Sequence, residues 1–124
     1  MIHNLFGEIT FNIGWKRKKD INLFGKKYSI ELNIQAYFEK DGITSKQEEA
    51  YVEFTESEDY KIKIIENLLY NYSDSAESRF IPRTLIFERD GSYALLLDDN
   101  DELDGGIAVC LKPVEKIILQ DEYL

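Results

Sequence analysis

The chain has 124 residues, which is the length of a single domain. Its hydrophobic fraction of 44%, with eight Tyr and seven Phe, supplies enough apolar side chains for a core and excludes intrinsic disorder. The formal net charge of −9 argues against binding to nucleic-acid phosphates or anionic membrane surfaces. It favours encounter with a basic protein, although acidity also serves solubility alone.

Two further features bear on the compartment. Cys110 is the only cysteine, so no intramolecular disulfide can form. The N-terminus lacks a basic region followed by a long apolar stretch, and no segment approaches the ~20 apolar residues of a membrane span. We therefore expect a cytoplasmic protein.

Residues 5–15 (LFGEITFNIGW) alternate in hydrophobicity and predict a first strand that Gly14 and Trp15 end. The run KRKKD (residues 16–20) predicts a solvated, basic connector. The stretch INLFGKKYSIELNIQAYF then predicts a short strand, a turn at Gly25-Lys26 and a long strand. In the long strand, the apolar side chains at alternate positions are Tyr28, Ile30, Leu32, Ile34 and Ala36.

The pattern changes to a helical period after a turn at Asp41-Gly42. Ser45 followed by Glu48 is typical of a capping box, and it predicts a helix over residues 45–54. Thr55 followed by Glu58 repeats the signal before a second helix over residues 58–72. Its apolar stripe consists of Ile62, Ile65, Leu69 and Tyr72, widened by Ile64 and Leu68.

The last third returns to strands. Residues 73–83 predict a connector, and Asp90-Gly91 predicts a β-hairpin between two flanking strands. Residues 105–113 (GGIAVCLKP) predict a strand that Pro113 ends, with Cys110 buried and unreactive within it. Residues 115–124 could form a final strand or an ordered tail.

The order of strands, helices and strands predicts one domain over residues 1–124 with an α+β fold. We expect a meandering antiparallel sheet with the two consecutive helices packed on one face.

No cofactor, metal or catalytic residues are predicted. The acidic stretch at residues 98–104 lacks the bidentate Glu of an EF-hand, because position 12 of such a loop would be Leu111. His3 and Cys110 are too few for a structural zinc site. The chain also lacks a nucleophile elbow and a phosphate-binding loop. Weak calcium binding, or an enzyme that uses the acidic stretch, stays as a minor alternative.

The same acidic stretch is the first candidate for a partner-binding surface. A turn joining two strands has no need of five carboxylates, since like charges repel there. We expect the turn to protrude with all five near its rim: Asp98, Asp99, Asp101, Glu102 and Asp104. The second candidate surface is the acidic face of the first helix, formed by Glu48, Glu49 and Glu53.

Several segments together resemble a family of small acidic bacterial proteins. The family is mostly of unknown function and includes immunity proteins of contact-dependent growth inhibition and other polymorphic toxin systems. The resembling segments are LFGEI with GW, ITSKQEEAYVEF, PRTLIFERDGSYALLLDD, GGIAVCLKP and QDEYL. They span most of the chain, and none is a catalytic motif.

The resemblance implies an immunity-protein-like domain that binds and neutralises a cognate toxin without chemistry. The toxin would be basic, as a nuclease domain is, and an acidic protein would gain electrostatic steering toward it. The alternative is an acidic housekeeping or regulatory interaction domain with a different partner.

Overall fold

A computed structural model describes all 124 residues and shows an α+β fold, as predicted. The strands are β1 (Ile2–His3), β2 (Gly7–Glu8), β3 (Thr10–Phe11), β4 (Trp15–Leu23), β5 (Lys26–Ile34), β6 (Phe80–Phe87), β7 (Tyr93–Asp99), β8 (Gly106–Lys112) and β9 (Lys116–Leu119). The helices are α1 (Ser45–Glu56), α2 (Glu58–Tyr72), α3 (Ala76–Arg79), α4 (Gln120–Tyr123) and a 3₁₀ turn, η1 (Glu39–Asp41). None of them is long and apolar enough to cross a bilayer.

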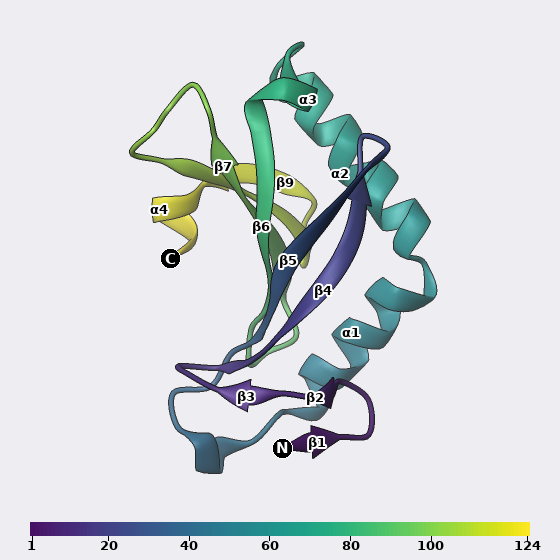
Figure 1. Cartoon of the computed structure of the whole chain (residues 1–124), viewed down its shortest axis with the longest axis vertical. Coiled ribbons are helices and arrows are strands. Elements are labelled where there is room, and N and C mark those ends of the chain that lie inside the picture. The colour runs from purple at the N-terminus through teal and green to yellow at the C-terminus, as the bar shows by residue number, and fades with distance from the viewer.

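The main sheet has seven strands that lie side by side in chain order from β3 to β9 (Figure 1). All neighbours pair antiparallel except β5 and β6, which pair parallel. The sheet is therefore mixed, and the expectation of a wholly antiparallel meander was wrong at this one pair. The reason is that α1 and α2 follow each other end to end across Ser57, so they return the chain to the end of the sheet where β5 began.

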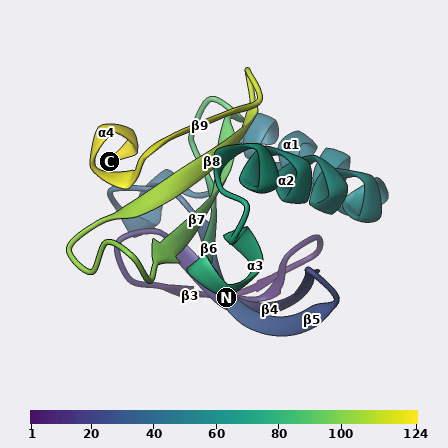
Figure 2. The same ribbon diagram turned by 90° about the horizontal axis from the view of Figure 1, so that it is seen from above.

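Helices α1 and α2 cover one face of the sheet, as predicted, and α4 lies against the other face (Figure 2). The larger core fills the space between α1, α2 and the sheet, and includes Phe54, Ile65 and Leu69. A smaller cluster on the opposite face consists of Ile86, Ala94, Leu96, Ala108 and Cys110, against which Ile118 and Tyr123 pack. Cys110 is buried, as expected.

The predicted strand over residues 5–15 is divided into two short strands, β2 and β3, and Trp15 begins β4 instead of ending a strand. Phe6 and Ile9 are buried, but Ile13 has a φ of 52° and Gly14 a φ of 112°. These positive angles break the extended backbone and turn the chain back into β4.

The basic run at residues 16–20 lies inside β4, so its assignment as a connector was wrong. Long side chains at two inward positions reach polar partners on the helices. Arg17 Nη2 donates to Tyr51 Oη at 2.6 Å, and Lys19 Nζ lies 3.0 Å from Glu58 Oε1. Because both cations reach a polar partner, the strand continues through them to Leu23.

The helix caps differ from the predicted ones. The capping box of α1 uses Thr44 and Gln47, one residue before the expected pair. The Thr55 hydroxyl donates to the carbonyl of Tyr51 and caps nothing, so α2 begins at Glu58 without a side-chain cap.

The predicted connector over residues 73–83 contains α3 and the start of β6, where Phe80 and Pro82 are buried. Pro82 is tolerated because it sits beside a register shift in the β6–β7 ladder. The hairpin turn at Asp90-Gly91 is confirmed. Residues 115–124 form both a strand, β9, and a short helix, α4.

Candidate functional site

The acidic loop (residues 98–104) holds three of its carboxylates, those of Asp98, Asp99 and Asp101, in ion pairs with arginines of the same chain. Asp99 accepts two hydrogen bonds from the Arg79 guanidinium, at 2.8 and 3.0 Å. Asp98 accepts one from Arg83 Nε at 2.6 Å. Asp99 is only 5% exposed, so the expectation that it lies on the rim of the loop was wrong. The arginine explains the burial, because a charge leaves water readily only when it is paired and hydrogen-bonded.

The rest of the loop is fastened to the same arginine. The backbone amide of Asn100 donates to the carbonyl of Arg79 at 2.8 Å, and the Asp101 carboxylate lies 3.4 Å from Arg79 Nε. The guanidinium also lies over the rings of Tyr72 and Phe80. Arg79 thus holds the loop against the end of α2.

Only Glu102 and Asp104 of the five predicted acids lack an ion pair. They flank Leu103, whose side chain is 92% exposed at the tip of the loop. The unpaired charge of the acidic loop is therefore concentrated at its tip.

The acids of α1 are partly compensated as well. The Glu53 carboxylate lies 2.8 Å from Lys112 Nζ and 3.3 Å from Lys61 Nζ, and the hydrogen bond from Lys112 is the main cause of its lowered pKa. Glu48 lies 3.2 Å from Nε2 of His3, and Glu49 has no ion pair. The acidic loop and α1 lie at opposite corners of the molecule, so they do not form one continuous surface (Figures 1 and 2).

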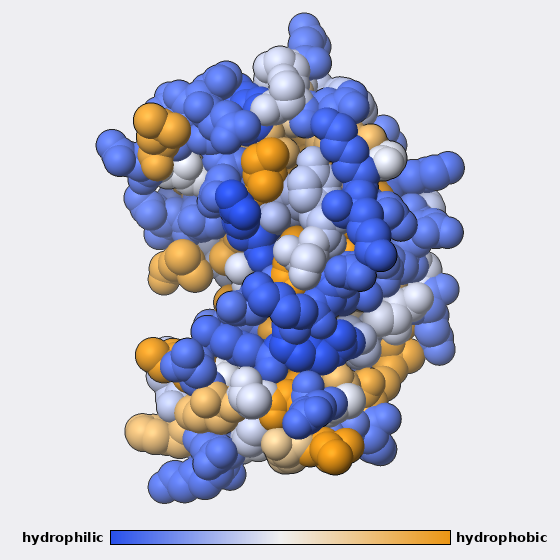
Figure 3. Space-filling model, in the orientation of Figure 1, coloured by the Kyte–Doolittle hydropathy of each residue, from blue (hydrophilic) through white to orange (hydrophobic).

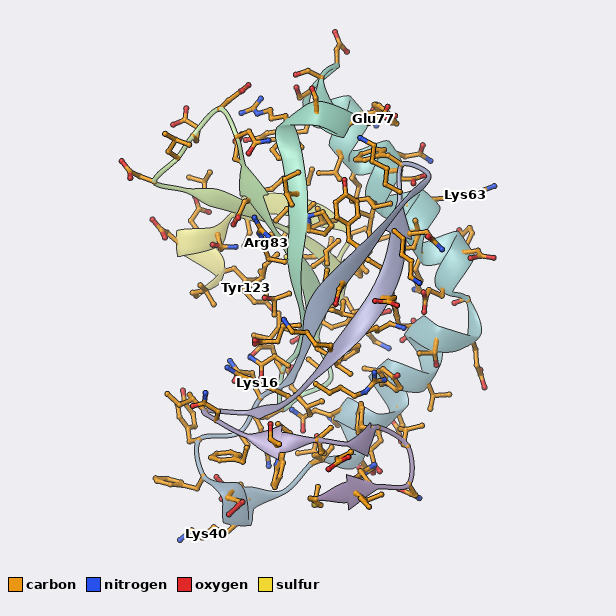
Figure 4. All side chains as sticks on the ribbon, viewed as in Figure 1. Lys16, Lys40, Lys63, Glu77, Arg83 and Tyr123 are labelled. Carbon is orange, nitrogen blue, oxygen red and sulfur yellow. The ribbon has the colours of Figure 1, made fainter.

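A third surface, which the sequence did not indicate, is a cleft of about 520 Å³ between α4 and the segment that follows β5. Its lining includes Ile13, Tyr37, Glu88, Arg89, Asp90 and Tyr123. Figure 3 shows a hollow at the left edge of the molecule with apolar residues above and below it. Tyr123 is on the same side of the sheet, between Arg83 and Lys16 in the view of Figure 4.

Two large apolar side chains border the cleft and are almost fully exposed. Ile13 is 72% exposed at the turn before β4, and Tyr37 is 85% exposed after β5. Phe38, next in the chain, is exposed too. Grouped apolar side chains on a surface mark binding sites more often than isolated ones do.

Glu88 lines the cleft, is half-buried, and has Tyr123 as its only hydrogen-bonding side-chain partner. Tyr123 Oη donates to its Oε2 at 2.8 Å, and no cation lies within ion-pair distance. Burial raises the pKa of Glu88, and burial together with the neighbouring carboxylate raises the pKa of Tyr123. The carboxylate is therefore desolvated without an opposite charge beside it.

The other charged groups of the cleft are already bound. Arg89 donates to the backbone carbonyls of Gln35, Asp41 and Gly42, and so fixes the segment after β5 as a wall. Asp90 accepts from the amide and hydroxyl of Ser92, which lowers its pKa. The lining of the cleft therefore combines aromatic and aliphatic side chains with a half-buried carboxylate that has no opposite charge beside it.

The sequence carried one weak signal for this cleft. The hydrophobic alternation of the long strand breaks after Ala36, where two aromatic residues follow each other. The tertiary pairing of this segment with the β6–β7 turn is a long-range event that no local pattern indicates.

The structure groups no three His, Cys, Asp or Glu side chains in an arrangement that could hold a metal ion. The fold and these surfaces define an α+β domain with a mixed seven-stranded sheet and a partly apolar, carboxylate-lined cleft. Residues 5–103 match the model of a family described as a domain of unknown function (DUF6985), and the chain belongs to this family. The match contains every cleft residue named above except Tyr123. No curated protein and no solved structure matches the chain.

Proposed function

We propose that this protein is an immunity protein, which binds a cognate toxin domain with a basic surface and neutralises it without chemistry. The cleft is the centre of the interface, and the acids around it attract the partner. The cognate toxin belongs to a contact-dependent growth inhibition or related system, as the resemblance of the sequence implies.

The observation that supports this proposal best is the composition of the cleft. Ile13 and Tyr37 expose apolar surface that water solvates poorly, and Glu88 lacks an opposite charge. Protein interfaces combine such aromatic anchors with complementary charges. A basic partner with an apolar contact patch would bury Ile13 and Tyr37 and would neutralise the charge of Glu88.

The charge of the whole chain supports the same reading. A net charge of −9 raises the rate of encounter with a basic protein, and the unpaired acids Glu49, Glu102 and Asp104 contribute to that field. A basic toxin, such as a nuclease, needs its positive groove for the phosphate backbone. An acidic protein seated there would block the substrate.

The test is co-expression with candidate toxin domains encoded beside this gene, followed by a binding measurement with the purified pair. We expect the wild-type protein to protect the cells and to bind the toxin. Tyr37→Ala should weaken binding about tenfold or more, as the loss of an aromatic anchor does. Tyr60→Ala is the matched control, because Tyr60 is also exposed but lies on α2, away from the cleft.

Two outcomes would contradict the proposal. Binding to a protein whose activity is unaffected would favour the alternative of a regulatory interaction domain. Equal loss of binding in Tyr37→Ala and Tyr60→Ala, or no loss in either, would remove the cleft from the interface.

A further inference from the structure

The geometry points to a specific ligand for the cleft: we propose that Glu88 receives the guanidinium of an arginine side chain from the partner, between the rings of Tyr37 and Tyr123. The inference rests on the proposed function in that the arginine belongs to the neutralised protein. It adds the chemical group that the cleft recognises and the residue that recognises it.

The first reason is that Glu88 lacks the cation that most partly buried carboxylates of this chain have beside them. Most other partly or fully buried carboxylates have cations beside them: Asp99 has Arg79, Glu58 has Lys19, and Glu53 has Lys61 and Lys112. Glu66 has no cation, but its carboxylate accepts a hydrogen bond from the backbone amide of Phe24. Glu88 has only the hydroxyl of Tyr123, on Oε2, and its other oxygen has no partner. A desolvated carboxylate with a free oxygen is the group that gains most from a cationic ligand.

The second reason is that the cleft cannot supply the cation itself. Arg89 is its only lining cation, and its guanidinium is committed to three backbone carbonyls of residues 35–42. Asp90 has a nearby cation, Lys46, and two donors from Ser92. Glu88 is therefore the acceptor that remains, and Asp90 adds negative charge at longer range.

The third reason is the shape and chemistry of the walls. Tyr37, Tyr123 and Ile13 line a cleft of about 520 Å³ that is open to the surface. A guanidinium is planar, is weakly hydrated and stacks on aromatic rings, whereas an ammonium keeps its water more strongly. Walls of this kind favour arginine over lysine.

The test uses two small probes of nearly the same shape that differ in charge and in one hydrogen-bond donor group. N-acetyl-arginine amide carries the guanidinium, and N-acetyl-citrulline amide replaces it with a neutral urea of nearly the same shape. Each is titrated into the ¹³C,¹⁵N-labelled full-length protein at constant ionic strength. The side-chain carboxyl resonance of Glu88 and the amides of Glu88 and Ser92 are followed by NMR.

We expect saturable shifts at Glu88 and Tyr37 with the arginine probe, at least about tenfold weaker binding of the citrulline probe, and a lower pKa of Glu88 in the arginine complex. Bringing a cation to the carboxylate favours its charged form, which gives the sign of that pKa change. Equal responses to the two probes, or no response to either, would overturn the assignment.

Two variants separate recognition from support of the fold. Glu88→Gln keeps an oxygen that can accept from Tyr123 but removes the charge, and it should weaken binding of the arginine probe about tenfold or more, or ~1.4 kcal/mol. Glu56→Gln removes an exposed carboxylate elsewhere, on α1, and should bind as the wild type does. Wild-type affinity in Glu88→Gln, with an unchanged fold by NMR, would refute the role of Glu88.

The same variants distinguish this inference from the proposed function. If Glu88→Gln neutralises the toxin with wild-type affinity, the arginine assignment fails while toxin neutralisation stands. If the wild-type protein binds the arginine probe at Glu88 but protects against no toxin, the proposed function fails and the assignment of the cleft stands.

Discussion

Asp99 is the only charged residue of the chain that is buried, and it shows how a carboxylate is kept in the interior. Arg79 supplies two hydrogen bonds and is itself placed over two aromatic rings. The hydrogen bonds from Arg79 hold the pKa of Asp99 below its usual range. The acid-rich sequence of the loop therefore includes one residue that stabilises the fold.

We expect Asp99→Asn to lower the free energy of unfolding by about 2–3 kcal/mol at pH 7, because it removes the buried charge that accepts two hydrogen bonds from Arg79. The pKa of Asp99 is lower in the folded state than in the unfolded state. Its charge therefore stabilises the folded protein at pH values above the unfolded pKa, near 3.9. This stabilisation is lost as the pH falls through the folded-state pKa. Urea denaturation should therefore show a smaller deficit at pH 3 than at pH 7. Asp104→Asn, the unpaired control, should change stability by less than ~0.5 kcal/mol.

Glu88 should behave in the opposite way. Its pKa is raised by burial, so the folded state binds the proton more tightly than the unfolded state does. The stability that Glu88 contributes is therefore present at pH values below its unfolded pKa, near 4.3, and is lost as the pH rises through its folded-state pKa.

We therefore expect Glu88→Gln to be as stable as the wild type near pH 4 and more stable at pH 7, as measured by thermal or urea denaturation. Tyr123→Phe removes the hydrogen bond but keeps the charge of Glu88, so it serves as a control. A variant that is less stable than the wild type at pH 7 would show that the charge of Glu88 supports the fold.

At the scale of the elements, α2 packs against the sheet and contributes side chains to the larger core. Leu69 is fully buried in it, so Leu69→Ala should lower the free energy of unfolding by about 2–5 kcal/mol. Leu103→Ala is the matched control, because the same truncation on the exposed tip of the acidic loop should cost less than ~0.5 kcal/mol. Chemical denaturation of the two variants measures both values, and similar costs would contradict the assigned facing of α2.

The elements that could be predicted were those with a local signal. The helical spacing of Ile62, Ile65 and Leu69 and the Asp90-Gly91 turn predicted α2 and the hairpin correctly. The basic run of β4 could not be predicted as a strand, because Tyr51 and Glu58, which contact Arg17 and Lys19, lie far along the chain.

The candidate site follows the same rule. The position of the acidic loop was predictable from its composition, but the arginines that pair with Asp98 and Asp99 were not. The cleft was not predictable, since residues near positions 13, 36, 89 and 123 meet there only in the folded chain.

At the scale of the whole molecule, the net charge predicts a salt-dependent association with a basic partner. Replacing Glu102 by Gln and Asp104 by Asn together removes the unpaired acids of the loop without touching Asp99. We expect the association rate constant to fall about threefold at low ionic strength, and the difference to shrink above ~0.15 M salt, where the screening length is ~8 Å. Stopped-flow mixing of the two proteins measures the association rate constant at low ionic strength and its change with added salt.

A control for this prediction removes two charges elsewhere, through Glu56→Gln and Asp59→Asn at the junction of α1 and α2. Equal slowing in both double variants would assign the effect to net charge alone. A larger effect in the loop variant would place the loop near the approaching partner.

The single parallel pair of the sheet has a consequence for the order of folding. It joins two antiparallel meanders, β3–β5 and β6–β9, through a ladder of Glu31–Ile34 with Thr84–Phe87. Those paired residues are about fifty positions apart in the chain, whereas each hairpin closes over a short turn. We expect each meander to gain hydrogen-exchange protection during refolding before the β5–β6 ladder does, which pulse labelling can resolve. If both meanders and the β5–β6 ladder gained protection at the same time, α1 and α2 would have to dock early enough to bring the two halves of the sheet together in one step.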